Sequence, residues 1–228
     1  MMTFTFNGEN SRTFGLFIEQ FPQEAGGQKI VQSVQVAGRT GALTIDTGAI
    51  QNVTKTYSVA FRGGPERMRE VRQWLALSSG YCRLEDDYDP DVYRLARVVT
   101  LPDFENIRNK YGRGTIQFDC DPRRFLKEGE RAVVGPVQND WMPSRPIIKI
   151  TANGPGGVSV GSYAITITTD PTMDIYIDSE MREVHNGTTS LASVVSFAEF
   201  PILEHGTNNI ASTGAVTAVE IIPNFWQP

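Results

Sequence analysis

Alternation of large apolar residues with small or polar ones is the feature that most restricts the fold of this chain. Large side chains occupy every second position in four segments, residues 3–6, 56–61, 163–168 and 173–178. Successive side chains of a strand point to opposite faces, so each segment can bury one face and leave the other to water or a partner. Turn residues such as Gly63-Gly64 separate these runs. The pattern predicts a mainly β, mainly antiparallel fold.

One segment has helical periodicity instead. Pro65 follows two glycines, which suits the first turn of a helix, and apolar residues recur at helical spacing from Met68 to Leu75. Gly80 is placed to end this helix. We predict one α-helix at about 65–78. Its arginines are expected mainly on a solvated face, with a dedicated anion site as the alternative.

The composition changes near the middle of the chain. Residues 127–146 are rich in glycine, proline and charged residues, and a new series of strand-like runs begins at Pro146. We therefore predict two domains, residues 1–134 and 143–228, joined by a linker region at 127–146. The second domain would have the size of a small β-sandwich.

Charge and cysteine content limit the classes of function. The formal net charge is -5, from 26 acidic and 21 basic residues, whereas nucleic-acid binders usually carry a basic patch. Cys82 and Cys120 are too few for a disulfide framework, so reduced thiols are expected. The first residues resemble a strand rather than a secretion signal, and no run approaches the roughly 20 apolar residues of a membrane helix. We expect a soluble protein that is made in the cytoplasm and does not insert into a membrane.

Residues that could support catalysis are scarce. Histidine, the usual proton shuttle near neutral pH, occurs only as His185 and His205, each beside turn residues. The sequence has no Gly-x-Ser-x-Gly elbow, no phosphate-binding loop and no zinc-ligand spacing. We predict no enzymatic activity, no catalytic residue, no cofactor and no bound metal.

An acidic run at 85–91 is weighed separately. Three aspartates at alternate positions from Asp87 to Asp91 are similar to the start of a calcium loop, but valines stand where that loop needs glycine and glutamate, at Val92 and Val98. The favoured interpretation is a tight acidic β-turn. In it, aspartates would bond nearby backbone amides and Pro90 would fix the bend.

Several short motifs occur in an order that resembles one known family. They are Phe6-Asn7-Gly8 with Phe14-Gly15-Leu16, the segment 36–43, Trp74-Leu75 with Gly80-Tyr81, the run 84–94, the segment 116–125, and in the second half 177–180, 200–209 and 222–226. Taken together they resemble the siphophage distal tail protein family of phages and prophages of Gram-positive hosts. The resemblance assigns a structural turn to Asp86, Asp87, Asp89, Pro90, Asp91, Tyr93 and Arg94.

This resemblance implies a particular architecture. Members form a homo-hexameric ring at the virion tail tip, with the tail tube on one face and a tail-associated hub or fibre protein on the other. The first domain is expected to be a tail-tube-like β-sandwich or split barrel, and the second a galectin-like, carbohydrate-module-like β-sandwich. A receptor-binding protein is a further candidate partner, and DNA would pass through the ring without sequence-specific binding.

Subunit contacts are expected in the region 36–56. The family pattern, rather than residue chemistry, singles out Gly38, Arg39, Gly41 and Leu43. The chain is short for the family and its second half has no long insertion, so an extended arm that grips receptor-binding proteins is not expected.

Two other functions stay open at this point. One is carbohydrate binding through aromatic residues of the second domain, although core packing explains the same residues better: Tyr163, Tyr176, Phe197, Phe200, Phe225 and Trp226. The other is a tail-tube or other ring protein of the same broad fold.

Overall fold

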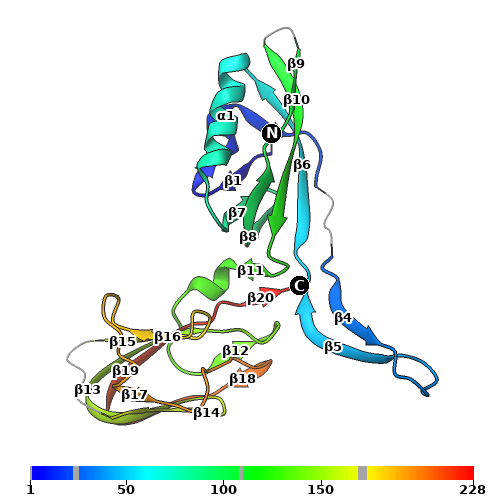
Figure 1. The fold of residues 1–228 in the computed structure, drawn as a ribbon. Coiled ribbons are helices and arrows are strands. Elements are labelled where there is room, and N and C mark those ends of the chain that lie inside the picture. The colour runs from blue at the N-terminus through cyan, green and yellow to red at the C-terminus, as the bar shows by residue number, and fades with distance from the viewer. Residues whose placement is uncertain (1, 23–25, 108–109, 169–173) are drawn as a thin grey trace. The chain divides into compact units, whose positions relative to one another are not determined.

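The computed structural model describes residues 2–22, 26–107, 110–168 and 174–228 (Figure 1). The chain divides into two compact units, one from the N-terminus to Arg124 together with Pro228, and the other Phe125–Gln227. Both are built mainly from antiparallel strands, as the alternation predicts. The fourth alternating run starts at Met173, which lies outside the described residues.

The sheet of the first unit has the strand order β2-β1-β7-β8-β10-β6-β3, with β9 also pairing with β10. The strands are β1 (Phe4–Phe6), β2 (Glu9–Asn10), β3 (Leu16–Ile18), β6 (Val53–Arg62), β7 (Cys82–Asp86), β8 (Asp89–Thr100), β9 (Phe104–Ile107) and β10 (Tyr111–Cys120). A short 3-10 helix, η1 (Ser11–Phe14), joins β2 to β3. Met2, just before β1, makes an antiparallel bridge to Ile18 of β3. This bridge brings the two sides of the sheet together, so the sheet is nearly closed into a barrel.

The core of the first unit follows the period of two. Phe4 and Phe6 in β1 are fully buried, and Tyr57, Val59 and Phe61 occupy alternate buried positions in β6. The rings of Phe4 and Tyr57 stack with their centroids 4.9 Å apart. Strand sequence and core packing thus agree on which face is inside.

Helix α1 (Pro65–Leu77) confirms the predicted helix. Gly64 is the N-cap, Pro65 occupies the first turn, and Val71, Trp74 and Leu75 are buried against the core. The helix ends at Ser78, two residues before the expected stop at Gly80, because Ser78 already has extended backbone angles. Gly80 instead takes a positive φ of 70° in the turn that leads to β7.

Two further strands of the first unit form a sheet of their own. Strands β4 (Lys29–Val34) and β5 (Leu43–Ile50) pair with each other in a two-stranded hairpin. We call residues 29–50 the arm; Figure 1 shows β5 leading on into β6.

In the second unit, β13 is the central strand and pairs with β19 along almost its whole length. The opposite edge of β13 pairs first with β15 and then with β14. The strands are β11 (Arg124–Leu126), β12 (Val137–Asn139), β13 (Ile147–Val160), β14 (Tyr163–Ile167), β15 (Ile175–Asp178), β16 (Glu183–His185), β17 (Val195–Ser196), β18 (Gly206–Asn208), β19 (Ile210–Ile222) and β20 (Trp226–Gln227). The core again uses alternate positions, among them Ile148, Ile150, Ile165, Ile167, Ile175 and Ile177.

The segment 127–146, predicted as a linker, is instead packed into the second unit. It contains η2 (Lys127–Glu130) and β12, and Val137 and Asn139 are buried. The Asn139 amide donates to the carbonyls of Met142 and Leu203, and its oxygen accepts from Trp141 N. Glycine and proline do interrupt regular strands here, but the pairing of β12 with β18 and the buried Asn139 amide hold the segment within the second unit.

Candidate assembly surfaces

One face of the arm carries most of its large apolar side chains, while Val31, 49% exposed, lies on the other face opposite Asp46. Val34 lies opposite Leu43, and Gln32 lies opposite Ile45. Ile30 is two residues from Gln32 and so shares its face. The arm's apolar face therefore comprises Ile30, Val34, Leu43 and Ile45, whose exposed fractions are 37%, 44%, 39% and 44%.

Such a hairpin is poorly stabilised by itself. Two isolated strands are marginal in water, and their outer edges offer unpaired backbone groups to other chains. Every described residue of β4 and β5 is exposed except Ile50, which is half-buried. A row of apolar side chains on an otherwise uncovered hairpin makes this face a candidate surface for contact with another chain.

The four residues expected at subunit contacts lie at or next to the tip of the arm. Gly38 and Gly41 both have positive φ, 81° and 84°, which allows the tight reversal between β4 and β5. Arg39 lies between them, is exposed, and forms no ion pair within the described part of the chain. Leu43 is the first residue of β5. The structure thus brings Gly38, Arg39, Gly41 and Leu43 together at the free end of the hairpin.

A bulge bends the arm near its root. The register shifts between Lys29 and Val31, where Gly48 has a φ of 70°. Thr47 Oγ1 donates to Ile30 O at 2.9 Å, and Gly48 N donates to Asp46 Oδ1 at 2.8 Å. Such bulges redirect a strand while keeping its pairing.

The acidic turn is a hairpin bend at Asp87-Tyr88 between β7 and β8. Asp86, the last residue of β7, is buried and accepts hydrogen bonds from Lys55 Nζ and Tyr57 Oη. Burial first, and the adjacent Asp86 second, raise the pKa of Tyr57 well above its ordinary value. Asp87 accepts from the backbone N and Oγ1 of Thr3, at 2.7 and 2.6 Å.

The expected roles of this turn therefore need correction. Asp86 and Asp87 bind groups far away in the sequence rather than nearby amides, because β1 and β6 lie beside the turn in the folded sheet. Pro90 does not fix the bend, since it is the second residue of β8, beyond Asp89, and is exposed. Asp91 is also exposed.

The end of the motif holds neighbouring segments in place. The Arg83 guanidinium lies over the ring of Tyr93, 3.8 Å from its centroid. Arg94 is buried and donates to the carbonyls of Asp121 and Pro122, at 3.3 and 3.0 Å. These contacts make the turn a structural element of the sheet.

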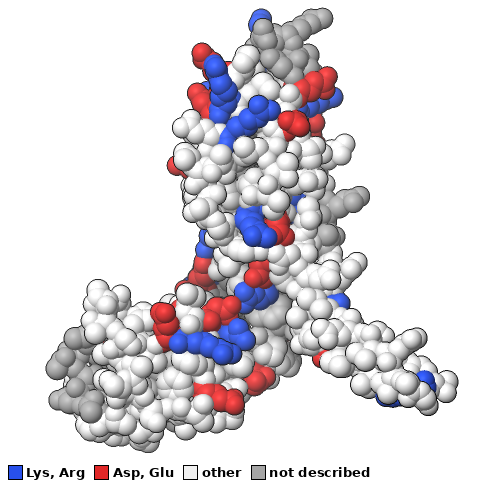
Figure 2. Space-filling model, viewed as in Figure 1, with Lys and Arg blue, Asp and Glu red and all other residues white. Residues whose placement is uncertain are grey.

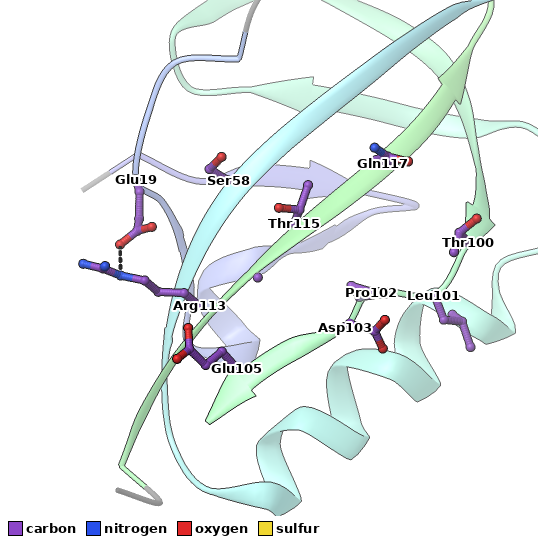
Figure 3. Close-up of a pocket in the computed structure, with 11 residues that line it drawn as sticks. Glu19, Ser58, Thr100, Leu101, Pro102, Asp103, Glu105, Arg113, Thr115 and Gln117 are labelled. Atoms are coloured by element: carbon purple, nitrogen blue, oxygen red, sulfur yellow. Dashed lines mark ion pairs between the residues drawn. The ribbon is translucent and has the colours of Figure 1, made fainter. Parts of the chain in front are cut away.

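A surface depression of about 570 Å³ lies across β6 and β10 (Figure 3). Ser58, Thr115 and Gln117 line its middle, and the segment Thr100–Asp103 forms one side. At the other side Arg113 pairs with Glu19, with Nε and Oε1 2.9 Å apart. Sequence reasoning did not identify this depression, because its residues come from four separate stretches of chain.

Histidine, cysteine and acidic side chains are the candidate metal ligands in the described part of the chain. No cluster of three histidine, cysteine or acidic residues there could hold a metal ion. His185 Nδ1 accepts from Gly187 N, and His205 Nδ1 lies 3.2 Å from Trp141 O. Cys82 and Cys120 are both free thiols, and burial raises the pKa of Cys120 to about 11. Among the described residues, no helix is long and apolar enough to span a membrane.

The aromatic residues of the second unit serve packing and local contacts. Phe225 is buried, and Phe197 packs edge-on against Phe200. Tyr176 stacks on His185 with an interplanar angle of 9°, and Trp226 Nε1 donates to Pro143 O.

Comparison with known proteins gives a result only at the level of structure. No family model and no curated protein matches this chain. The crystal structure of the SPP1 Dit (gp 19.1) protein, described as a paradigm of the hub adsorption apparatus in Gram-positive infecting phages, is similar with a TM-score of 0.73. The identity is 13%, over 97% of this chain and 98% of that chain. A chain of the phage P2 baseplate, in its activated conformation with Ca, has a TM-score of 0.56 and 13% identity, over 100% of this chain and 98% of that chain.

Proposed function

We propose that this chain is a distal tail protein, a non-enzymatic structural component of a phage tail tip. Its copies form a hexameric ring that joins the tail tube on one face to the tail-associated hub and receptor-binding apparatus on the other. The observation that carries this proposal is the end-to-end likeness of the fold to a phage hub adsorption protein, over 97% of the chain. A second similar structure comes from a phage baseplate.

The arm supplies the contact that a ring requires. A closed ring needs one heterologous contact, repeated around a symmetry axis, in which one surface of a subunit meets a different surface of the next. The apolar face of the arm, Ile30, Val34, Leu43 and Ile45, is an exposed surface of this kind. Figure 2 shows the arm almost free of acidic residues on the side in view, with basic residues near its end.

The first test is the native mass of the purified chain, with negative-stain images of the same sample. The expected result is a particle of about 151 kDa, six copies of the 25.2 kDa chain, with a central channel. A monomer that persists at high concentration would contradict ring formation by the chain alone.

A pair of arm variants tests the surface itself. Ile45→Asp places a charge on the apolar face and is expected to release subunits. Thr44→Asp places the same charge on the next residue, which lies on the opposite face, and is expected to leave the ring intact. Equal behaviour of the two variants would show that the apolar face is not buried in the ring.

A further inference from the structure

Negative charge is in excess around the depression on β6 and β10. Its lining includes three carboxylates, Glu19, Asp103 and Glu105, but a single cation, Arg113. Arg113 is bound to Glu19, and Asp103 lies 3.6 Å from Arg72. Glu105 is exposed, and within the described residues no cation pairs with it. The depression therefore offers a carboxylate to a cation from outside the subunit.

Exposed apolar side chains lie at the end of β8, where the chain enters the depression. Val99 and Leu101 are two residues apart at the end of β8, and their exposed fractions are 69% and 45%. Leu101 itself lines the depression. An acidic hollow flanked by apolar side chains is suited to a partner segment that combines a cation with apolar residues.

The end of the arm has this combination. Arg39 is exposed at the tip without an ion pair in the described chain, and Val34 and Leu43 stand together at the adjoining end of the apolar face. The arm tip therefore matches the depression in two ways: its cation is opposite in charge to the carboxylates, and its apolar side chains suit the apolar side chains there.

The arm tip cannot reach the depression of its own copy. From Leu43 near the tip the chain runs through β5 to the root at Ile50, and β6 then continues away from the arm to Ser58 at the depression (Figure 1). Eight residues of strand span about 26 Å, so the tip lies far from the depression of its own copy and extends toward a neighbour. Such a head-to-tail contact is the kind that closes rings.

We propose that the arm tip of each copy docks into the depression of the next copy. Arg39 pairs with Glu105, while Val34 and Leu43 cover Val99 and Leu101. This inference rests on the proposed ring, and it names the receiving surface of the subunit contact.

Charge exchange tests the proposal. Arg39→Glu and Glu105→Arg are each expected to weaken self-association about tenfold, and the double variant is expected to recover it, because every contact then carries the reversed pair. Lys29→Glu makes the same charge change at the root of the arm and serves as the matched control, with wild-type association expected. Self-association is measured by analytical ultracentrifugation. Single variants that associate like the wild type, or a double variant that recovers nothing, would overturn the proposal.

A cross-link separates this proposal from ring formation. A Thr40→Cys chain is mixed with a Thr115→Cys chain under mild oxidation, and the wild type, with Cys82 and Cys120, is the control. Disulfide-linked dimers of the mixed pair support docking, even in a preparation without stable rings. Rings without the mixed cross-link would leave the proposed function standing and overturn the docking site, and absence of both would overturn both.

Discussion

Asn52, in the short connection between the arm and β6, donates its side-chain amide to both carboxylate oxygens of Asp119 in β10, at 3.1 Å each. The same amide lies 2.5 Å from Tyr81 Oη, and Arg97 Nε donates to Asp119 Oδ2 at 2.8 Å. Asp119 thus gathers donors from the arm root, from β8 and from Tyr81, just before β7. This cluster anchors the root of the arm to the outer face of the sheet.

Removal of the Asn52 amide should loosen the arm more than the fold. We expect Asn52→Ala to lower the free energy of unfolding by no more than about 1 kcal/mol, because the cluster is exposed. Limited proteolysis should cut the arm faster in this variant, and ring formation should weaken. Thr54→Ala, at the position paired with Asp119, is the control. Equal cleavage of both variants would argue against an anchoring role.

The buried pair of Lys55 and Asp86 should matter for stability instead. The side chains of both residues are less than a tenth exposed, at 9% and 6%. Asp86→Asn leaves the Lys55 ammonium buried without its counter-charge, so we expect a loss of about 3–5 kcal/mol in the free energy of unfolding, measured by urea denaturation. Asp91→Asn, in the same acidic run but exposed, should change it by less than about 0.5 kcal/mol. Similar losses for both would refute the assignment.

Periodicity predicted most of the fold, because the alternating runs also proved to be core strands. Tyr57, Val59 and Phe61 are buried as their spacing predicts, and Pro65 starts the helix. Periodicity could not predict that residues 127–146 pack into the second unit. Their packing depends on hydrogen bonds between residues far apart in the sequence, such as Asn139 to Leu203, and these bonds leave no local sequence pattern.

The candidate surfaces were predictable only in part. Leu43 and Ile45 alternate with threonine and aspartate, so a strand with one apolar face is visible in the sequence. That this face stays uncovered is a property of the folded sheet, where β4 is the partner of β5 and no third strand joins them among the described residues. The depression forms where Glu19, Thr100 and Arg113 come together in the folded sheet, and their spacing in the sequence does not predict this.

Stability should decline in alkaline solution. The ordinary pKa of the Cys120 thiol is 9.0, and burial raises it to about 11 in the folded chain. The unfolded thiol therefore loses its proton first as the pH rises, so folding stability is complete below pH 9 and falls between pH 9 and about 11, by up to roughly 3 kcal/mol. Tyr57, whose pKa is also raised, extends the decline above pH 10. Urea denaturation across this range should show a shallower decline for Cys120→Ala, and an unchanged decline would contradict the assignment.

Close packing at Gly112 yields the last prediction. A Cβ atom at this buried position in β10 would lie 2.2 Å from Phe61 Cε1 and 2.4 Å from the backbone oxygen of Glu105. Gly112→Ala must therefore displace the Phe61 ring from its edge-on contact with Phe104, or push β9 away from β10. We expect a loss of about 1–3 kcal/mol in the free energy of unfolding. Gly26→Ala, where an added Cβ meets nothing within 4 Å, should be nearly neutral. Since β9 carries Glu105, the Gly112 variant should also weaken self-association if the depression receives the arm, and normal association despite lowered stability would separate β9 from that contact.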